Sequence, residues 1–414
     1  MNIKVRTAVI GAGASGLAAA ITAGEKKSGK TIIIEKQDRA GRKLLATGNG
    51  RCNISNLHIS RDNYHGDRAI IDRVLSNYPY ERAERMCNSL GFLLRSDSEG
   101  RVYPMSNRSD TVLDCMLRKL RSLSVDIMYG EEIRFLGKPD DKFCIVLKND
   151  TVYADNIIMA AGSYAAPHLG SDKSAVKLMY DSFGFKYNTM YPALCPVICR
   201  EKYASLKGVR AKGSVSLIAD DNIIKTESGE IQFNDTGLSG ICIFNLSGYV
   251  NEFLLCGTAD GNNCKKIKIS VDLMPDRHER DIIGFLRKCR RIFSGEDNTL
   301  LLSGLFDKKL SAVLMKCISA GSVTCEKLSE DDLRKAAHII KNFEFTPSRI
   351  SDVRNAQTAA GGYGSSIVEP ATLMCRKVRN LFICGELLDV YGDCGGYNLH
   401  FAFGSGIMAA ENIK

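Results

Sequence analysis

The chain of 414 residues has no tryptophan, few prolines and only 6 histidines. The histidines form no H-E-x-x-H pair and the 15 cysteines form no C-x-x-C pair; Cys195 and Cys199 come closest and are one residue too far apart. The usual zinc patterns and a dithiol redox motif are therefore lacking, and no metal site is predicted. The odd number and irregular spacing of the cysteines indicate free thiols in a reducing cytoplasm, mostly buried as small apolar residues.

A strong excess of charge is lacking as well. The formal net charge of +9 is modest for this length, and the densest basic patches, residues 265–268 and 287–291, contain no interleaved aromatic residues. These patches are typical of a solvated face rather than of a nucleic-acid surface, so no nucleic-acid partner is expected. An acidic small molecule would suit the charge balance equally well.

Long uninterrupted apolar runs are also missing. Residues 7–24 carry no charge, so a hydropathy scan alone would suggest a signal peptide or a membrane span. However, four glycines interrupt the run, alanine rather than leucine dominates it, and a second apolar segment follows soon after. A buried strand–helix–strand unit explains it better, and no membrane association is expected.

The N-terminal segment KVRTAVIGAGASGLAAAITAGEKKSGKTIIIEK predicts a strand, a tight turn, a helix and a second strand. A G-x-G-x-x-G motif forms the turn. Gly11 permits the sharp bend, Gly13 lets the backbone approach a pyrophosphate, and Gly16 lets helix and strand pack closely. Glu35 ends the second strand, where it can accept both hydrogen bonds from an adenosine ribose and disfavours a 2′-phosphate. The segment therefore predicts a dinucleotide site.

The C-terminal segment separates FAD from NAD, which share an adenosine diphosphate half. In RNLFICGELLDVYGDCGGYNLHFAFGSGIMAAENI, a strand at residues 381–384 ends in Gly385-Glu386, and a glycine-rich turn leads into a helix at about residues 399–411. In FAD proteins of the glutathione-reductase type, a late strand ends in glycine plus an acid that binds the ribityl chain. The next helix points its N-terminus at the flavin, where it stabilises the negative charge of the reduced ring.

A third segment, ADNIIMAAGSYAAP, lies midway along the chain. It predicts a strand at residues 156–159, and the tripeptide that follows, which contains Ala161 and Gly162, resembles the A-T-G segment of such FAD proteins. The preceding stretches SVDIMYGEEIRFL and KFCIVLKNDTVYADNII are typical of a β-meander. In this architecture Glu132 and Ile133 would flank the adenine.

The loop GRKLLATGNGRCNISN, residues 41–56, is too glycine-rich for a stable helix and too polar for a core strand. Its glycines permit close approach, its asparagines offer donors and acceptors, and its basic side chains suit phosphate. An Ω-loop without a ligand would not need this density of special residues.

Together with NDTGLSGICIFNLS, NAQTAAGGY and GELLDVYGDCGGYNLHFAFGSG, this loop resembles, over essentially the whole chain, the BaiN-like family of flavoproteins, also known as the aminoacetone oxidase family of NAD(P)/FAD-dependent oxidoreductases. The resemblance implies FAD as cofactor, with Arg42 and Lys43 near the pyrophosphate and residues 48–53 around the ribityl chain and ring. Motifs and resemblance together predict these cofactor-binding residues: Gly11, Ala12, Gly13, Ala14, Ser15, Gly16, Glu35, Lys36, Arg42, Lys43, Thr47, Gly48, Asn49, Gly50, Cys52, Asn53, Glu132, Ile133, Ala161, Gly162, Gly385, Glu386, Asp389, Gly396, Tyr397, Asn398 and Leu399.

The chain departs from the family pattern at several positions. The family usually has A-T-G-G where this chain has A-A-G-S at residues 160–163, and A-Q-V-T-A-G-G where it has A-Q-T-A-A-G-G. It also has glutamine and tryptophan at the positions of His400 and Phe401, threonine at Cys394 and proline at Ile241. Several of these positions are expected to face the flavin, so the resemblance implies the fold more directly than one member's substrate.

The predicted fold is α/β: a Rossmann-like FAD-binding domain with a parallel sheet and a β-meander, a β-barrel-like insertion and a small helical domain. Residues 192–273 alternate as strands with turn signals between them, and residues 276–341 have helical patterns. The predicted boundaries are 1–190 with 346–414 for the discontinuous FAD domain, 191–274 for the β-domain and 275–345 for the helical domain. We expect substrate specificity at the junction of the insertion with the FAD domain, because pockets favour domain interfaces.

No second strand-flanked G-x-G-x-x-G follows the first, so a dedicated NADPH domain of the disulfide-reductase type is not expected. Two electron routes remain open. NAD(P)H docks transiently and reduces the flavin of an enone-type C=C reductase, or a small amine reduces the flavin of an oxidase or dehydrogenase that uses oxygen. Either enzyme passes a hydride between flavin N5 and a small organic substrate.

Candidates for proton transfer near the ring are Tyr164, Asp235, Tyr391, Cys394 and His400. Each also has an ordinary explanation: His400 lies inside the last helix and can satisfy a local hydrogen bond, and Cys394 can be a packing thiol. The catalytic group therefore stays open at this point. Two other functions also remain possible interpretations of the sequence. One is an FAD-binding protein whose flavin is structural, and the other is a flavoprotein that modifies RNA, although no RNA-binding module is evident.

Overall fold

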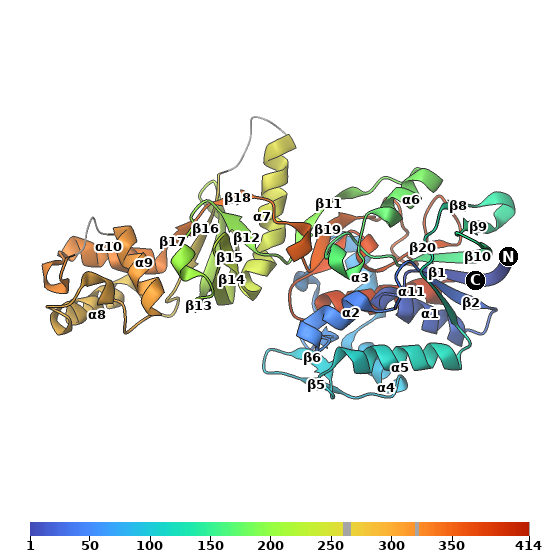
Figure 1. Cartoon of the computed structure of the whole chain (residues 1–414), viewed down its shortest axis with the longest axis horizontal. Helices are drawn as coiled ribbons and strands as arrows, with labels where there is room; N and C mark the ends of the chain where they lie inside the picture. The colour runs from blue at the N-terminus through green and yellow to red at the C-terminus, as the bar shows by residue number, and fades with distance from the viewer. Residues whose placement is uncertain (260–265, 319–322, 414) are drawn as a thin grey trace. The chain divides into compact units, whose positions relative to one another are not determined.

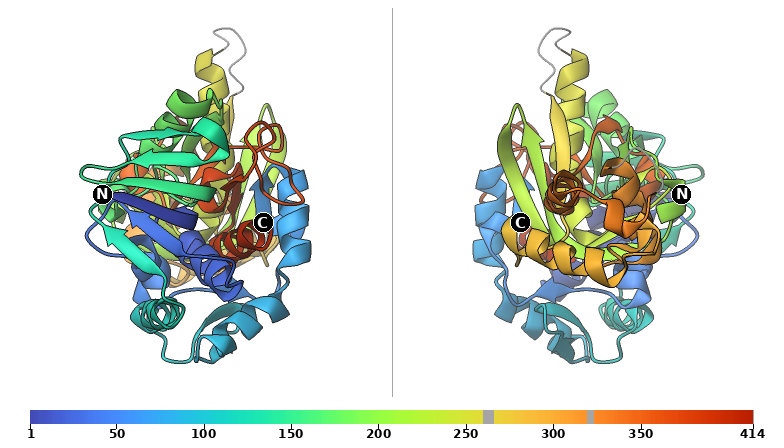
Figure 2. Two further views of the ribbon diagram at one scale, coloured as in Figure 1. Left: turned by 90° about the vertical axis from the view of Figure 1, so that its right-hand side faces the viewer. Right: turned by 90° about the vertical axis from the view of Figure 1, so that its left-hand side faces the viewer.

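The computed structural model describes residues 1–259, 266–318 and 323–413 (Figure 1). The chain divides into two compact units, the first formed by residues 1–191 and 357–414 and the second by residues 192–356. The N-terminal strand and the C-terminal helix therefore belong to the same unit, as Figure 2 also shows. Among the described residues, no helix combines the length and the apolar character that crossing a membrane would require.

The first unit is built on a seven-stranded sheet with the strand order β7-β2-β1-β10-β9-β8, and β20 also pairs with the end of β10. Its strands are β1 (Asn2–Ile10), β2 (Thr31–Glu35), β7 (Asp126–Tyr129), β8 (Phe135–Gly137), β9 (Phe143–Val146), β10 (Thr151–Met159) and β20 (Leu381–Ile383). Strands β7, β2, β1, β10 and β20 are parallel, whereas β8, β9 and β10 form an antiparallel meander. The predicted α/β fold is confirmed, with one correction: residues 126–129 extend the parallel part and do not belong to the meander.

Helices pack against this sheet and against each other. They are α1 (Ala14–Glu25), α2 (Arg42–Ala46), α3 (Arg68–Asn77), α4 (Tyr80–Ser89), α5 (Ser109–Ser122), α6 (Ser174–Phe183) and α11 (Tyr397–Glu411). Helices α1 and α11 contact each other closely, because a Cβ at Gly406 would lie only 2.2 Å from the Ser15 carbonyl oxygen. The small residues of these two helices, rather than an apolar stripe, thus determine how near their backbones come.

Short strands fix the loops of the first unit. They are β3 (Ser55–Asn56), β5 (Leu94–Ser96) and β6 (Arg101–Pro104) in one sheet, β4 (Tyr64–Gly66) with β21 (Val390–Gly392), and β11 (Asn188–Ala193) with β19 (Thr358–Gly362). The antiparallel pair β4–β21 places His65 directly opposite Tyr391. Residues far apart in the sequence therefore meet next to the turn that begins α11.

The second unit contains a seven-stranded antiparallel sheet with the order β17-β16-β13-β14-β15-β12-β18. Its strands are β12 (Val197–Cys199), β13 (Arg210–Ala219), β14 (Asn222–Phe233), β15 (Gly237–Ser239), β16 (Ile267–Asp272), β17 (Phe343–Phe345) and β18 (Pro347–Arg349), and its helices are α7 (Ile241–Ala259), α8 (Glu279–Ile292), α9 (Lys308–Ile318) and α10 (Glu330–Lys341). Helix α7 falls in a stretch that the sequence predicted as strands only. Strand and helix side chains share one apolar core, and the proposed boundary between a β-domain and a helical domain stays a prediction.

Candidate functional site

The three motif glycines between β1 and α1 have different environments. Gly11 has φ +103°, and a Cβ there would lie 2.7 Å from the Ala160 carbonyl oxygen; a Cβ at Gly16 would lie 2.0 Å from the Gly11 oxygen. Both glycines are therefore required by the folded backbone. Gly13 has φ −80°, and a Cβ there would meet nothing within 4 Å. Because Gly13 leads into α1 with no side-chain cap, open space adjoins free N–H groups, an arrangement that fits a pyrophosphate.

A pocket lies at the carboxyl ends of β1, β2 and β10. Six of the predicted cofactor residues line it together: Gly11, Glu35, Lys36, Glu132, Ile133 and Ala161. Asp172 and Ser174, which the sequence did not single out, complete the same wall. The carboxyl ends of parallel strands are where open α/β sheets bind nucleotides, so this pocket fits an adenosine half.

Glu35 holds the glycine loop and remains able to bind a ribose. Its two carboxylate oxygens accept hydrogen bonds from the backbone N–H of Ala12 at 2.6 Å and of Gln37 at 2.8 Å. Each carboxylate oxygen has a second acceptor site, so two sites stay available for hydroxyl donors.

Lys36 lies between two acids of this pocket. Its ammonium is 2.7 Å from a carboxylate oxygen of Asp172 and 3.0 Å from one of Glu132. The hydrogen bond with Asp172 is the main cause that raises the pKa of Lys36. These ion pairs join segments after β2, β7 and β10.

The glycine-rich loop after β2 is more ordered than the sequence suggested. Residues 42–46 form the short helix α2, so the prediction that this stretch cannot be helical is wrong for its first half. The glycines begin only after that turn, and Gly48 and Asn49 are left-handed, with φ 58° and 56°. Cys52 is also left-handed and fully buried, and burial raises the pKa of its thiol to about 12, so it is a packing residue in the resting protein.

The two basic residues of that loop that were predicted to lie near the pyrophosphate already have protein partners. Arg42 donates to the Gln37 side chain and to the His168 carbonyl, yet its buried Nε has no hydrogen-bond partner among the described residues. Lys43 forms an ion pair with Glu386 at 2.6 Å, and the same carboxylate oxygen accepts a hydrogen bond from the Ser163 hydroxyl at 2.7 Å. The structure thus brings the predicted residues 42, 43 and 386 near the strand ends, and Ser163 joins them.

The turn before α11 is fixed by backbone contacts. Gly396 has φ +103°, and a Cβ there would lie 2.1 Å from the Ser55 carbonyl oxygen. The Asn398 amide accepts from the Gly392 N–H at 2.9 Å and donates to the Gly392 oxygen at 2.8 Å, so this predicted ligand serves the turn itself. No side chain caps the first turn of α11. Its free N–H groups suit the anionic edge of a reduced flavin.

Asp389, another predicted cofactor residue, has a partner outside the glycine-rich loop. One of its carboxylate oxygens accepts a hydrogen bond from the Asn188 side chain at 2.7 Å, and burial raises the pKa of this acid. Asp389 therefore contacts β11 rather than the glycine-rich loop.

His400 is a structural residue in this fold. It is fully buried; its Nε2 lies 2.8 Å from the Tyr78 carbonyl oxygen and its Nδ1 2.9 Å from the Ser55 hydroxyl. A carbonyl only accepts, so Nε2 carries the hydrogen and Nδ1 accepts from Ser55. Burial lowers the pKa of His400 to about 4, which keeps the ring neutral.

The other four proton-transfer candidates do not form one cluster. Tyr164 donates from its hydroxyl to the Met190 carbonyl at 3.0 Å, while Asp235 belongs to the second unit, where it pairs with Lys207 at 2.9 Å. The hydrogen bond with Lys207 lowers the pKa of Asp235. Tyr391 is buried in β21, and Cys394 follows in the turn.

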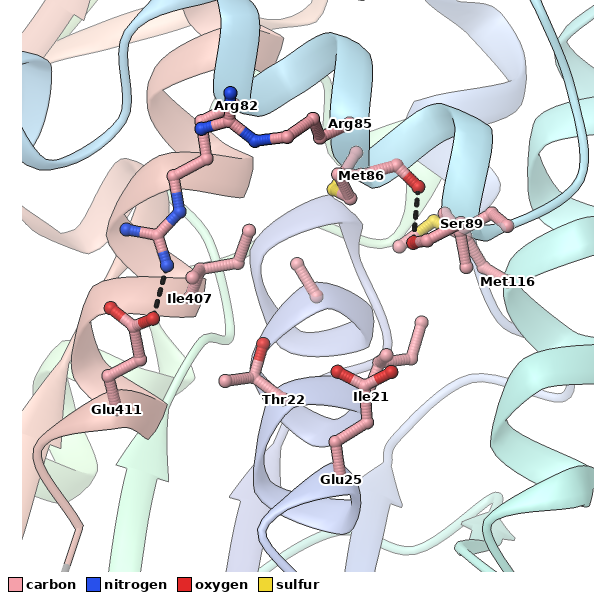
Figure 3. A pocket seen from close by; sticks show the side chains of 12 residues that line it. Ile21, Thr22, Glu25, Arg82, Arg85, Met86, Ser89, Met116, Ile407 and Glu411 are labelled. Atoms are coloured by element: carbon pink, nitrogen blue, oxygen red, sulfur yellow. Dashed lines mark hydrogen bonds and ion pairs between the residues drawn. The ribbon is translucent and has the colours of Figure 1, made fainter.

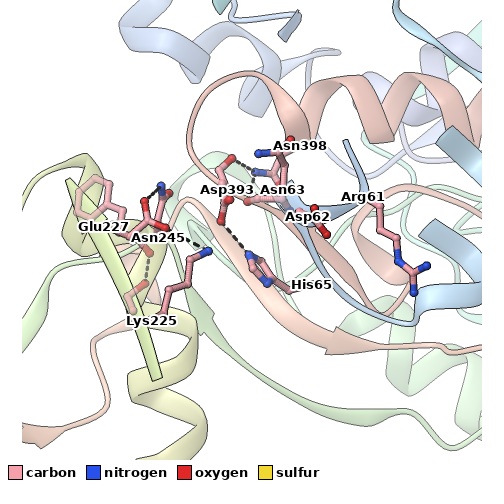
Figure 4. Close-up of polar contacts among 12 residues, drawn as sticks. Arg61, Asp62, Asn63, His65, Lys225, Glu227, Asn245, Asp393 and Asn398 are labelled. Carbon is pink, nitrogen blue, oxygen red and sulfur yellow. Dashed lines mark hydrogen bonds and ion pairs between the residues drawn. The ribbon is translucent and has the colours of Figure 1, made fainter. Parts of the chain in front are cut away.

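Sequence reasoning missed a histidine–aspartate pair beside the same turn (Figure 4). His65 Nε2 lies 2.8 Å from an Asp393 carboxylate oxygen, and the two side chains are only 11% and 10% exposed. The His65 ring also packs on the Tyr391 ring, with 4.7 Å between centroids. No motif surrounds His65 in the sequence; only the pairing of β4 with β21 reveals its partner. The pair places two titratable side chains beside the turn that begins α11.

Comparison with known proteins places these features in a family context. A family model described as the HI0933-like protein Rossmann domain matches residues 5–412. The chain is 32% identical, over 98% of both chains, to a protein of Clostridium scindens named 3-dehydro-bile acid delta(4,6)-reductase. It is 23% identical to a protein of Escherichia coli strain K12 named ribosomal RNA dihydrouridine synthase, over 98% of this chain and 97% of the relative.

Among solved structures, the 3-ketosteroid delta1-dehydrogenase of Sterolibacterium denitrificans covers 99% of this chain and 99% of its own, with a TM-score of 0.53 and 12% identity. At that identity the likeness shows a shared fold.

Proposed function

The chain belongs to the HI0933-like Rossmann family and is an oxidoreductase of the FAD-dependent kind, and we propose that it reduces a carbon–carbon double bond conjugated to a carbonyl in a small organic molecule. The observation that carries this proposal is the 32% identity, along nearly the full length of both chains, to a relative named as a reductase of an unsaturated 3-oxo bile acid. The family resemblance read from the sequence motifs is confirmed.

We assign the cofactor contacts from the geometry of the first unit. The N–H groups at the start of α1 would bind the pyrophosphate, Glu35 the adenosine ribose, and the start of α11 the anionic edge of the ring. When bound there, FAD supplies the hydride chemistry. The open space at Gly13 and the unpartnered Nε of Arg42 support a phosphate ligand at this edge of the sheet.

Saturation of a conjugated double bond requires a hydride at one carbon and a proton at the other. The His65–Asp393 pair is suited to deliver that proton, because the Asp393 carboxylate lies 2.8 Å from Nε2 and orients the imidazole. We therefore propose His65 as the proton donor and Asp393 as its positioning residue. The protonated imidazole loses one proton to the α-carbon of the substrate and regains it from water.

The reductant in this proposal is NAD(P)H, docked transiently. The test is an anaerobic titration of FAD-loaded protein, with NADH and NADPH added in turn and the visible flavin band recorded. We expect one of them to bleach the band, and a 3-oxo-4-ene steroid added next to restore it; the corresponding saturated ketone is the control and should restore nothing. A flavin that only a primary amine bleaches, with oxygen as acceptor, would support the amine oxidase instead.

His65 has a sharper test, because the two half-reactions can be measured separately. In His65→Gln, we expect reduction of the flavin by NAD(P)H to keep its rate, whereas reoxidation by the enone slows at least about a hundredfold, the usual size of a general-acid contribution. Stopped-flow absorbance measures both rates. His58→Gln, at an exposed histidine close in sequence, is the matched control. Equal slowing of both half-reactions in His65→Gln would indicate a structural role and refute the proton-donor assignment.

A further inference from the structure

A second cavity, of about 330 Å³, lies among α1, α4, α5 and α11 (Figure 3). Its lining has no residue in common with the pocket at the strand ends. It adjoins the C-terminal halves of α1 and α11, whose opposite ends begin at the two glycine turns described above. The cavity is therefore separate from the proposed cofactor site, and the proposed function does not use it.

Half of the residues that line this cavity are apolar. They include Ala18 and Ile21 of α1, Met116 of α5 and Ile407 of α11, and Met86 of α4 lies at one side. Methionine side chains adapt their shape to an apolar guest more readily than branched side chains do. The cavity volume is within the range of small-molecule pockets.

Four charged side chains line the cavity: Glu25, Arg82, Arg85 and Glu411. Glu411 pairs with Arg82 (Figure 3), and Glu25 pairs at 2.7 Å with Lys119, which lies outside the lining. Arg85, one turn after Arg82 on α4, has neither an ion pair nor a side-chain hydrogen bond with any residue in the described parts of the chain. Both carboxylates of the lining thus have a cationic partner, and the exposed Arg85 guanidinium is the charged group of the lining that has no ion pair among the described residues.

We propose that this cavity binds an amphipathic monocarboxylate, with its apolar chain among Ile21, Met116 and Ile407 and its carboxylate at Arg85. A guanidinium recognises a carboxylate with two parallel hydrogen bonds, which an alcohol cannot reproduce. Octanoate, which joins a short apolar chain to one carboxylate, is therefore the appropriate probe.

The test is calorimetric titration of octanoate into the FAD-loaded full-length protein. We expect saturable binding to the wild type and affinity at least about tenfold weaker in Arg85→Gln, because a hydrogen-bonded charge pair is lost. Octan-1-ol should bind the wild type at least about tenfold more weakly than octanoate, for the same reason. Arg73→Gln, at an exposed arginine on the neighbouring helix α3, should keep the wild-type affinity.

A second variant tests the apolar part of the site. Ser89→Phe, on the α4 side of the rim, places a ring over the cavity and should abolish binding of both octanoate and octan-1-ol while the flavin spectrum stays unchanged. The proposal is overturned if octanoate does not bind the wild type at millimolar concentration, or if Arg85→Gln and Arg73→Gln bind it equally well.

Discussion

At the level of single residues, the motif glycines show how far a sequence pattern reaches. The spacing of G-x-G-x-x-G predicted that all three positions need glycine, and the structure supplies different reasons for them. Gly11 and Gly16 are needed by the protein's own backbone, since added Cβ atoms would lie 2.7 Å and 2.0 Å from carbonyl oxygens. Gly13 has room for a side chain, so the packing of the protein itself does not require glycine there, whereas a bound pyrophosphate would.

That difference gives a clean test of the cofactor site. We expect Gly13→Asp to fold normally, because its φ of −80° and the open space tolerate a side chain, but to lose bound FAD, because a carboxylate would occupy the phosphate position. The measurement is FAD content per protein after purification, with circular dichroism as the check on folding. Gly284→Asp, at a glycine of α8 that also has nothing within 4 Å, is the control and should keep its flavin. Wild-type FAD content in Gly13→Asp would refute the site.

Other residue roles were beyond prediction because they depend on partners distant in the sequence. The sequence placed Lys43 near a phosphate and Glu386 near a ribityl chain; the structure pairs the two side chains at 2.6 Å. Likewise, nothing local distinguishes His65, whose partner Asp393 is brought to it by the pairing of two three-residue strands. Composition and spacing report which side chains are present, whereas proximity is decided by the fold.

At the level of elements, the parallel strands and C-terminal helix were predictable and α7 was not. Strands β1, β2 and β20 have continuous apolar runs bounded by glycine or charge, which are typical of strands covered on both faces. Helix α7, with the sequence ICIFNLSGYVNEFLLCGTA, has apolar residues on every side and no polar stripe that would reveal a period of 3.6. Turn-forming residues inside it further favour the wrong prediction of strands.

Helix α11 is held in place by His400. Its ring contacts the Ser55 hydroxyl of β3 and the Tyr78 carbonyl oxygen, which lies between α3 and α4. Burial lowers the pKa of His400 from 6.5 to about 4, so the folded state favours the neutral ring. The resulting contribution to the free energy of unfolding is present in full above pH 6.5 and is lost as the pH falls towards 4. The full effect is of the order of 3 kcal/mol.

We therefore expect His400→Gln to be less stable than the wild type at pH 7.5 but to lose less of its remaining stability between pH 6.5 and 4. Urea unfolding followed by circular dichroism across that range measures both properties. In His58→Gln, the free energy of unfolding should change with pH as it does in the wild type, because His58 is exposed. Parallel curves for the wild type and His400→Gln would show that His400 titrates normally and would contradict the assignment of a neutral, buried ring.

At the level of the whole molecule, the division into two units separates the predicted roles. Every predicted cofactor residue, from Gly11 to Leu399, lies in the first unit, and Asp235 is the only predicted site residue in the second. The two chain segments of the first unit come together through β10 and β20 and through α1 and α11. A long insertion is tolerated between them because the second unit has an apolar core of its own.

This separation predicts where FAD stabilises the chain. A ligand at a hundredfold excess over its Kd stabilises the state that binds it by about 2.7 kcal/mol, which slows hydrogen exchange through unfolding roughly a hundredfold. We expect this protection in peptides from β1–α1, from residues 41–56 and from the start of α11, measured by hydrogen–deuterium exchange of the FAD-free and FAD-loaded protein. Peptides from β13, β14 and α8 should exchange equally in both states.

The same experiment on Gly13→Asp is the control, since a chain that cannot hold the pyrophosphate should show no protection at any of these peptides on addition of FAD. Uniform protection over both units in the wild type would mean that the second unit unfolds together with the first, and that the cofactor stabilises the chain as one cooperative body. Protection confined to β13, β14 and α8 would place the cofactor in the insertion and overturn the assignment of the site to the parallel sheet, because no residue of the glycine motif lies there.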